Sequence, residues 1–227
     1  MFEVRYAHEL FLAGSEAIYE FATGIGDSSV DFLTATSPTW LIELVSVRTS
    51  DATRRATRKV GLVSETLLMP TANDPDRSEV GEIIRVQGKV GEKVWAGSSP
   101  TKFPPISGSY HMIVIDMRGF LLHGGGEGDY AEIAYGTQLF RPDQFPFLHR
   151  VSGRPIKGIF EPDNARAAAS LVQERVHFLS FVCERDFYEG EIHDVAFNVP
   201  NYNSFGDTDA AVAALKSHPL AKMTDKV

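Results

Sequence analysis

With 227 residues, 43% of them hydrophobic and only one a cysteine, the chain can bury a sizeable core as a single domain over 1–227 without disulfides or structural zinc. The net charge of −8 disfavours a protein coated in nucleic acid, but it is compatible with a local basic patch or with an acidic site that recruits a divalent cation. The sequence has no signal-peptide pattern and no apolar run long enough to span a membrane, so we expect a soluble cytoplasmic protein with no membrane partner.

The first fifty residues predict a helix followed by a three-stranded meander. Apolar residues at helical spacing predict the helix over 2–13 and place Glu9 on or beside its buried face. Alternating apolar residues predict strands at about 16–23, 29–35 and 39–48. We expect the last two strands to fold back on each other through a Thr-Ser-Pro turn, with one acidic residue in each strand.

The only dense basic cluster in the chain follows this meander. The Ser-Asp pair at 50–51 can cap a short helix that carries Arg54, Arg55, Arg58 and Lys59. Such a cluster is either a solvated helix face or a surface that faces phosphates.

Strands and helices alternate in the rest of the chain. We expect a strand within 61–69, a helix from Ser78 to about Trp95, a buried strand at 110–116, a helix at 129–135, a strand at 156–160, a helix at 165–174, strands at 177–183 and 192–199, and a terminal helix at 207–217 within 205–218. This alternation favours an α/β fold with a central mixed sheet flanked by helices.

Four polar residues fall in apolar settings: Glu9, Asp31, Glu43 and Gln87. The predicted hairpin can bring Asp31 beside Glu43, and two carboxylates a few ångströms apart raise the pKa of one of them. A divalent cation removes that cost, and Mg²⁺ takes one or two protein carboxylates together with several waters. We therefore expect Asp31 and Glu43 to hold Mg²⁺ or Mn²⁺, with Glu9 as a further ligand. For each acid alone, an ion-paired or turn-adjacent carboxylate is an equally good interpretation.

The order of these motifs resembles the PD-(D/E)XK nuclease superfamily, which has the restriction-endonuclease-like fold. The matching segments are Glu9 on the first helix, Val30-Asp31-Phe32-Leu33, Glu43-Leu44-Val45, and Gln87 with Lys89 or Lys93 on the later helix. The resemblance covers about residues 1–120, and the strand–helix–strand region at 121–200 is compatible with it. It implies a metal-dependent nuclease that hydrolyses phosphodiester bonds of nucleic acid.

The sequence departs from the family's pattern at Val45. The lysine that would stand there is expected to position the attacking water and to offset developing negative charge. Lys93 or Lys89 is the candidate replacement, because Arg48 would lie on the opposite strand face from Glu43 and Val45.

Three interpretations therefore stay open. In an active nuclease, Gln87 and Lys93 would orient water or phosphate, while Arg54, Arg55 and Arg58 would contact the nucleic-acid backbone. In a nuclease-fold protein without catalysis, the same surfaces would bind nucleic acid or a protein. A weaker interpretation is an unrelated α/β enzyme with its site at the glycine-rich loop near Asp116. Both a monomer and a homodimer are compatible with the sequence.

Overall fold

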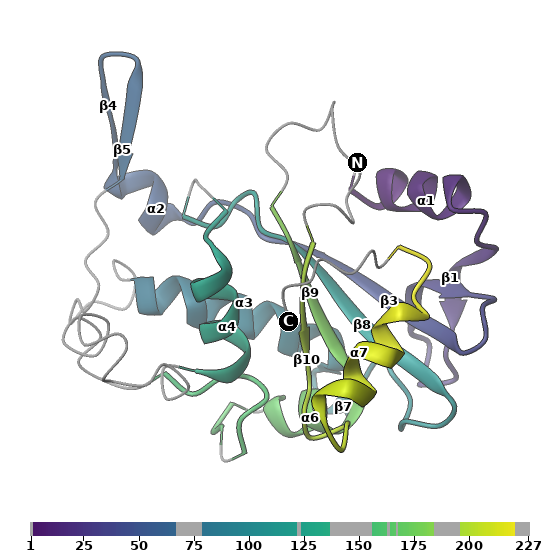
Figure 1. Ribbon diagram of the computed structural model, residues 1–227. Helices are drawn as coiled ribbons and strands as arrows, with labels where there is room; N and C mark the ends of the chain where they lie inside the picture. Colours follow the sequence, from purple (N-terminus) through teal and green to yellow (C-terminus); the bar gives the residue numbers. More distant parts are fainter. Residues whose placement is uncertain are drawn as a thin grey trace.

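The computed structural model describes residues 2–66, 79–121, 124–136, 156–162, 164–166, 168–183 and 196–220. At its centre lies a six-stranded mixed sheet with the strand order β1-β2-β3-β8-β9-β10 (Figure 1). The strands are β1 (Ala17–Ala22), β2 (Ser29–Thr34), β3 (Thr39–Ser46), β8 (Ser109–Asp116), β9 (Phe178–Val182) and β10 (Ala196–Pro200). The three central strands β3, β8 and β9 are parallel, and the strands at both edges pair antiparallel. The expected central mixed sheet is thus confirmed.

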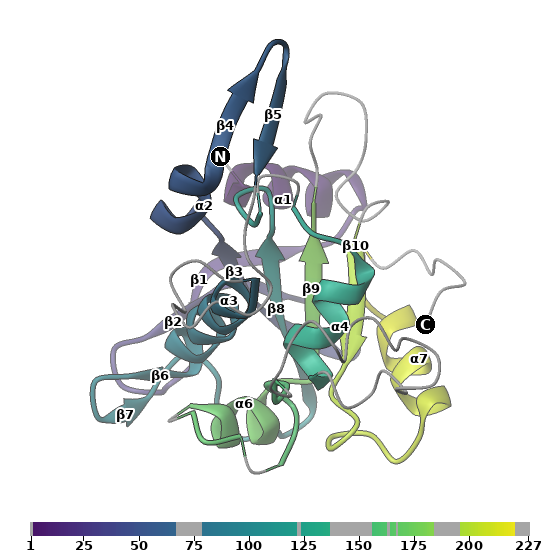
Figure 2. The same ribbon diagram turned by 90° about the vertical axis from the view of Figure 1, so that its left-hand side faces the viewer.

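Helices cover both faces of this sheet. They are α1 (Phe2–Leu12), α2 (Asp51–Ala56), α3 (Glu79–Val94), α4 (Glu127–Tyr135), α6 (Ala169–Arg175) and α7 (Thr208–Lys216). Figure 1 shows α3 and α4 on one side of the sheet and α1 and α7 on the other, and Figure 2 shows α3, α4 and α6 in front of it. None of the helices in the described ranges is long and apolar enough to cross a membrane.

Strand β3 is buried on both faces because its side chains alternate between the two helical layers. Ile42 and Leu44 belong to the core that includes α1 and α7. Leu41 and Val45 belong to the core that includes α3, α4 and α6. Glu43 lies between these last two in the sequence, so its carboxylate faces the α3 layer.

A β-hairpin projects from the rest of the molecule directly after α2 (Figures 1 and 2). It consists of β4 (Thr57–Val60) and β5 (Val63–Thr66), and Gly61 at its tip has a φ of 66°, which favours glycine. A second small hairpin, β6 (Trp95–Ala96) with β7 (Ser99–Pro100), follows α3. The hydroxyl of Ser50 caps α2 by accepting the N–H of Thr53 at 2.9 Å, as expected.

Three expected elements differ in the structure. The basic helix ends at Ala56, so Arg58 and Lys59 lie on β4 rather than on a helix. Residues 156–160 are an irregular segment and not a strand, because the N–H groups of Ile159 and Phe160 donate to carbonyls of α4. The expected helix at 165–174 begins only at residue 169. Parts of the expected strands at 61–69 and 192–199 lie outside the described residues.

Candidate active site

Asp31 and Glu43 meet where the pairing of β2 with β3 ends. The regular register runs from Thr34–Trp40 to Phe32–Ile42. Beyond it, the N–H of Asp31 donates to Oε2 of Glu43 at 3.3 Å, and the N–H of Leu44 donates to Oδ2 of Asp31 at 2.6 Å. Side-chain oxygens thus accept backbone N–H groups at the end of the ladder, and the hairpin holds the two acids side by side.

Two lysines neutralise Glu43 from other parts of the chain. Its Oε1 lies 2.7 Å from Nζ of Lys93 on α3 and 3.2 Å from Nζ of Lys102. The Glu43 side chain is 0% exposed, whereas the lysine side chains are 30% and 26% exposed. The N–H of Lys102 donates to the hydroxyl of Ser28 at 2.9 Å, which fixes its loop beside the start of β2. Lys102 carries no local sequence signal, so only the tertiary structure identifies it.

Burial raises the pKa of both carboxyl groups. For Glu43 the charge of Asp31 adds to the effect of burial, and Lys93 and Lys102 oppose it. For Asp31 the hydrogen bond from Leu44 and the same two lysines oppose burial. The two ammonium groups therefore do not fully offset the cost of ionising both carboxyl groups. An additional cation would favour the form in which both are ionised.

The donor set of this pair fits magnesium better than zinc. Among the described residues, no group of three or more His, Cys, Asp or Glu side chains could hold a metal ion. Mg²⁺ does not need such a group, because one or two carboxylates with waters suffice. Asp31 and Glu43 would hold the ion, in competition with the two lysines for Glu43.

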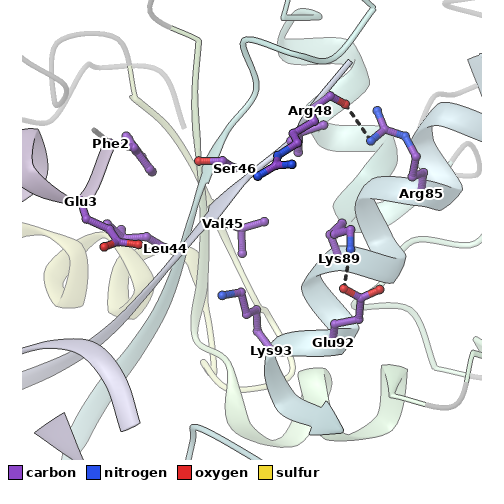
Figure 3. A pocket seen from close by; sticks show the side chains of 11 residues that line it. Phe2, Glu3, Leu44, Val45, Ser46, Arg48, Arg85, Lys89, Glu92 and Lys93 are labelled. Atoms are coloured by element: carbon purple, nitrogen blue, oxygen red, sulfur yellow. Dashed lines mark hydrogen bonds and ion pairs between the residues drawn. The ribbon is translucent and has the colours of Figure 1, made fainter. Parts of the chain in front are cut away.

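A cleft of about 550 Å³ lies between the start of α1, the second half of β3 and α3 (Figure 3), and neither Asp31 nor Glu43 is among the residues that line it. Lys93 and Val45 both line it. Arg48 lines it as well. Leu44 and Ser46, which alternate with Val45 along the strand, line it too, so the cleft reaches both faces of β3 where the strand ends, and Arg48 can line it from the face opposite to Glu43. Val45, which stands where a lysine is expected, thus has Lys93 on one side and Arg48 on the other.

The structure does not bring Glu9 to the carboxylate pair. Glu9 lies on α1, whose buried residues pack on the sheet face opposite to α3, and its Oε1 accepts from Nε of Arg5 at 3.4 Å. The acid of α1 that approaches the site is Glu3, which lines the cleft and raises the pKa of Asp31. The expectation that Glu9 adds a ligand is corrected on this ground.

Gln87 is also used elsewhere. Its amide Nε2 donates to the carbonyl oxygens of Ile133 and Lys157, both at 2.9 Å, and the side chain is completely buried. Gln87 therefore ties α3 to α4 and to the segment at 156–160 rather than orienting water or phosphate at the carboxylates. Lys89 likewise pairs with Glu92 at 2.6 Å on the helix surface.

The basic residues after β3 are exposed and differ in their partners. Arg54 pairs with Asp51 at 2.7 Å, and Arg58 pairs with Glu65 at 2.9 Å. Arg55 forms no ion pair within the described part of the chain. All three arginines lie on α2 and on the projecting hairpin, so they are available to a large partner.

Asp116, at the end of β8, is an ion-paired residue. Its two oxygens accept from Nε of Arg118 at 2.8 and 3.0 Å, and Oδ2 also accepts from a terminal nitrogen.

Comparison with protein-family models, curated proteins and solved structures finds no match for this chain. The Asp31–Glu43–Lys93 cluster is therefore the strongest candidate site in the described ranges.

Proposed function

We propose that this protein is a divalent-metal-dependent nuclease of the PD-(D/E)XK type, which hydrolyses phosphodiester bonds of nucleic acid. The observation that carries the proposal is the convergence of Asp31, Glu43 and Lys93 from two strands and one helix. Two carboxylates and a lysine at the end of a hairpin are the groups that such chemistry uses, and here the lysine comes from α3 instead of from position 45.

In this proposal each residue of the cluster has its own task. Asp31 and Glu43 hold the ion, and a bound Mg²⁺ or Mn²⁺ would activate water and stabilise charge on the phosphate. Lys93 lies at the boundary between Glu43 and the cleft, where its ammonium can orient water and offset negative charge on a phosphate oxygen. Lys102 keeps Glu43 ionised when Lys93 turns to the substrate.

Nucleic acid is the partner that the charge distribution favours. The chain as a whole carries −8, yet Arg54, Arg55 and Arg58 lie on the elements that directly follow β3. Phosphate contacts position a nucleic acid on a protein without reading its sequence. A homodimer stays a prediction.

A binding module without catalysis is the second candidate. One observation favours it: both oxygens of Glu43 already accept protein donors, from the N–H of Asp31 and from the two lysines. A site so fully satisfied by the protein itself does not need a metal, and Val45 leaves it without the family's usual lysine.

The two candidates are separated by measuring metal binding and cleavage on the same variants. Calorimetry with Mg²⁺ and Mn²⁺ is combined with cleavage assays on single- and double-stranded DNA and RNA. We expect Glu43→Gln and Asp31→Asn to lose both metal binding and cleavage, and Lys93→Met to lose cleavage but keep metal binding. Glu9→Gln is the matched control, because it neutralises a buried acid on the opposite face of the sheet.

Three outcomes decide between the candidates. Metal binding that survives Glu43→Gln would contradict the site. Loss of both metal binding and cleavage in Glu9→Gln would contradict the assignment of the metal to Asp31 and Glu43 without Glu9. Metal binding by the wild type without cleavage of any substrate would favour the binding module.

A further inference from the structure

The cleft that Lys93 lines has a second cationic position at its other end. Lys93 and Arg48 both line the cleft, and in Figure 3 they lie on either side of Val45. Because valine is short and apolar, no side chain from position 45 connects or neutralises these two cations.

Of the cations that line the cleft, only Arg48 has a side chain without a partner among the described residues. Three other cations line it, and each has a carboxylate partner: Arg85 with Glu82 at 2.6 Å, Lys89 with Glu92 at 2.6 Å, and Lys93 with Glu43 at 2.7 Å. The guanidinium of Arg48 makes no hydrogen bond or ion pair with any residue that the structure describes. Its charge is therefore available to a ligand.

The backbone that carries Arg48 is held firmly although its side chain is exposed. Nη1 of Arg85 donates to the Arg48 carbonyl at 2.9 Å, and the N–H of Val47 donates to the carbonyl of Asp116 at 2.9 Å. Gly119 lies against the same backbone so closely that a Cβ there would be 2.1 Å from the Val47 carbonyl oxygen. The fixed backbone limits the positions that the free guanidinium can reach, so that only the rotamers of the Arg48 side chain have to be ordered when a ligand binds.

We propose that Arg48 binds a backbone phosphate of a nucleic-acid strand whose neighbouring phosphate lies at the carboxylates and Lys93. The strand then runs through the cleft across Val45 and leaves it toward α2 and the projecting hairpin. This inference rests on the proposed function for the class of substrate, and it adds the path of the strand and a positioning role for Arg48.

The chemistry of the cleft selects this ligand. A guanidinium binds a phosphate through two parallel N–H···O bonds, which a lysine does not provide. Two separated cationic positions with an apolar surface between them suit a ligand with regularly spaced anionic groups. A polynucleotide backbone is such a ligand, and Arg55 adds an exposed cation on α2, the helix that follows Arg48 in the chain.

The first test measures binding without cleavage. Fluorescence anisotropy in EDTA follows the affinity for single-stranded DNA, duplex DNA and single-stranded RNA of one sequence at several salt concentrations. For Arg48→Ala we expect the slope of log K against log[salt] to fall by about 0.7 to 0.9, the effect of one lost phosphate contact. Lys216→Ala is the matched control, because it removes an exposed cation from α7 on the other face of the sheet.

The second test separates the position of Arg48 from the site of cleavage. Bis(p-nitrophenyl) phosphate contains one phosphate and cannot reach both positions. We expect Arg48→Ala to hydrolyse it at the wild-type rate with Mn²⁺, while oligonucleotide cleavage falls by about ten- to a hundredfold, as expected for one lost hydrogen bond to a charged group. Arg48→Lys should recover the salt slope and only part of the oligonucleotide rate.

Each outcome is decisive. An unchanged salt slope in Arg48→Ala, or failure of the wild type to bind any of the three nucleic acids, overturns the phosphate contact. An equal loss on both substrates overturns the neighbouring position and places Arg48 at the phosphate that is cut. A slope that depends on Arg48, without cleavage by the wild type, supports the contact and overturns only the nuclease activity. Unchanged thermal unfolding of Arg48→Ala shows that the effects are not caused by misfolding.

Discussion

The ammonium group of Lys93 lies 2.7 Å from Oε1 of Glu43, across a separation of 50 residues in the sequence. Glu43 comes from the middle of a strand that is buried on both faces, and Lys93 comes from the last turn of the helix that covers it. A charge that is fully removed from water is stable only with such a partner. The same contact therefore serves the stability of the fold and the chemistry that we propose.

Replacing Lys93 by methionine should destabilise the protein in a pH-dependent way. The pKa of Glu43 is already raised by burial, and removal of one of its cations raises it further. At about pH 8, where Glu43 has to ionise, we expect the free energy of unfolding to fall by about 1–3 kcal/mol, because Lys102 remains as a partner. The loss should shrink as the pH is lowered toward about 4.3, the pKa of glutamate in the unfolded chain, because a neutral Glu43 does not need the ammonium.

Urea unfolding at several pH values measures this effect. The matched control is Lys89→Met on the same helix, whose partner Glu92 is exposed, so its cost should stay within about 0.5 kcal/mol at every pH. Equal losses for the two variants would show that Glu43 does not depend on Lys93.

Gln87 should be a structural residue, and Gln87→Leu tests this. The substitution removes the donors to the carbonyl oxygens of Ile133 and Lys157 and leaves both without the amide. We expect the free energy of unfolding to fall by about 2 kcal/mol or more. Any cleavage activity, measured well below the melting temperature, should stay near the wild-type value. If Gln87→Leu has unchanged stability but has lost cleavage, Gln87 acts in catalysis and not in stabilising the fold.

Local patterns in the sequence were sufficient for one part of the site. Period-two alternation and a short turn predict that Asp31 and Glu43 meet, because both residues lie in one hairpin. Helical spacing also predicts the helix that carries Lys93, but not its contact with Glu43, for which Lys89 is an alternative candidate. The hairpin depends on neighbours in the sequence, and for that reason it could be predicted.

The other residues depend on packing that the sequence does not display. Helical spacing shows that Glu9 is buried, but not which face of the sheet α1 covers. A polar residue in a buried stripe, such as Gln87, has the same pattern whether it binds a ligand or a backbone carbonyl. Lys102 reaches Glu43 from a loop, and Arg48 lines the cleft from a position just after the end of β3. The segment at 156–160 is as apolar as a strand, but α4 accepts its N–H groups.

Glu132 on α4 should destabilise the protein at neutral and higher pH. Burial raises its pKa from 4.5 to about 7, and the charges of Asp129 and Glu79 contribute to this rise. The folded protein thus binds this proton more tightly than the unfolded chain does, so its stability increases as the pH falls from about 7 to about 4.5.

Glu132→Gln removes the cost of ionisation and keeps the shape of the side chain. At about pH 8 we expect it to raise the free energy of unfolding by about 1–2 kcal/mol, because solvent screens part of the effect at this half-buried position, and below about pH 4.5 the two proteins should converge. Glu16→Gln, at an exposed position between α1 and β1, should change little at either pH. A pH-independent difference between Glu132→Gln and the wild type would assign the effect to packing instead of to ionisation.

Among the three arginines that follow β3, Arg55 should contribute most to nucleic-acid binding. Asp51 and Glu65 partly neutralise Arg54 and Arg58, whereas Arg55 has no acidic partner in the described part of the chain. We therefore expect Arg55→Ala to lower the salt slope for duplex DNA by about 0.9, and Arg54→Ala and Arg58→Ala to lower it less.

A variant that removes the acidic partner of Arg58 tests the same comparison in the opposite direction. Glu65→Gln frees Arg58 and should increase the affinity measured by anisotropy at low salt. An affinity that falls in Glu65→Gln, or an effect of Arg58→Ala that exceeds that of Arg55→Ala, would show that the ion pair on the hairpin is itself the surface that the nucleic acid contacts.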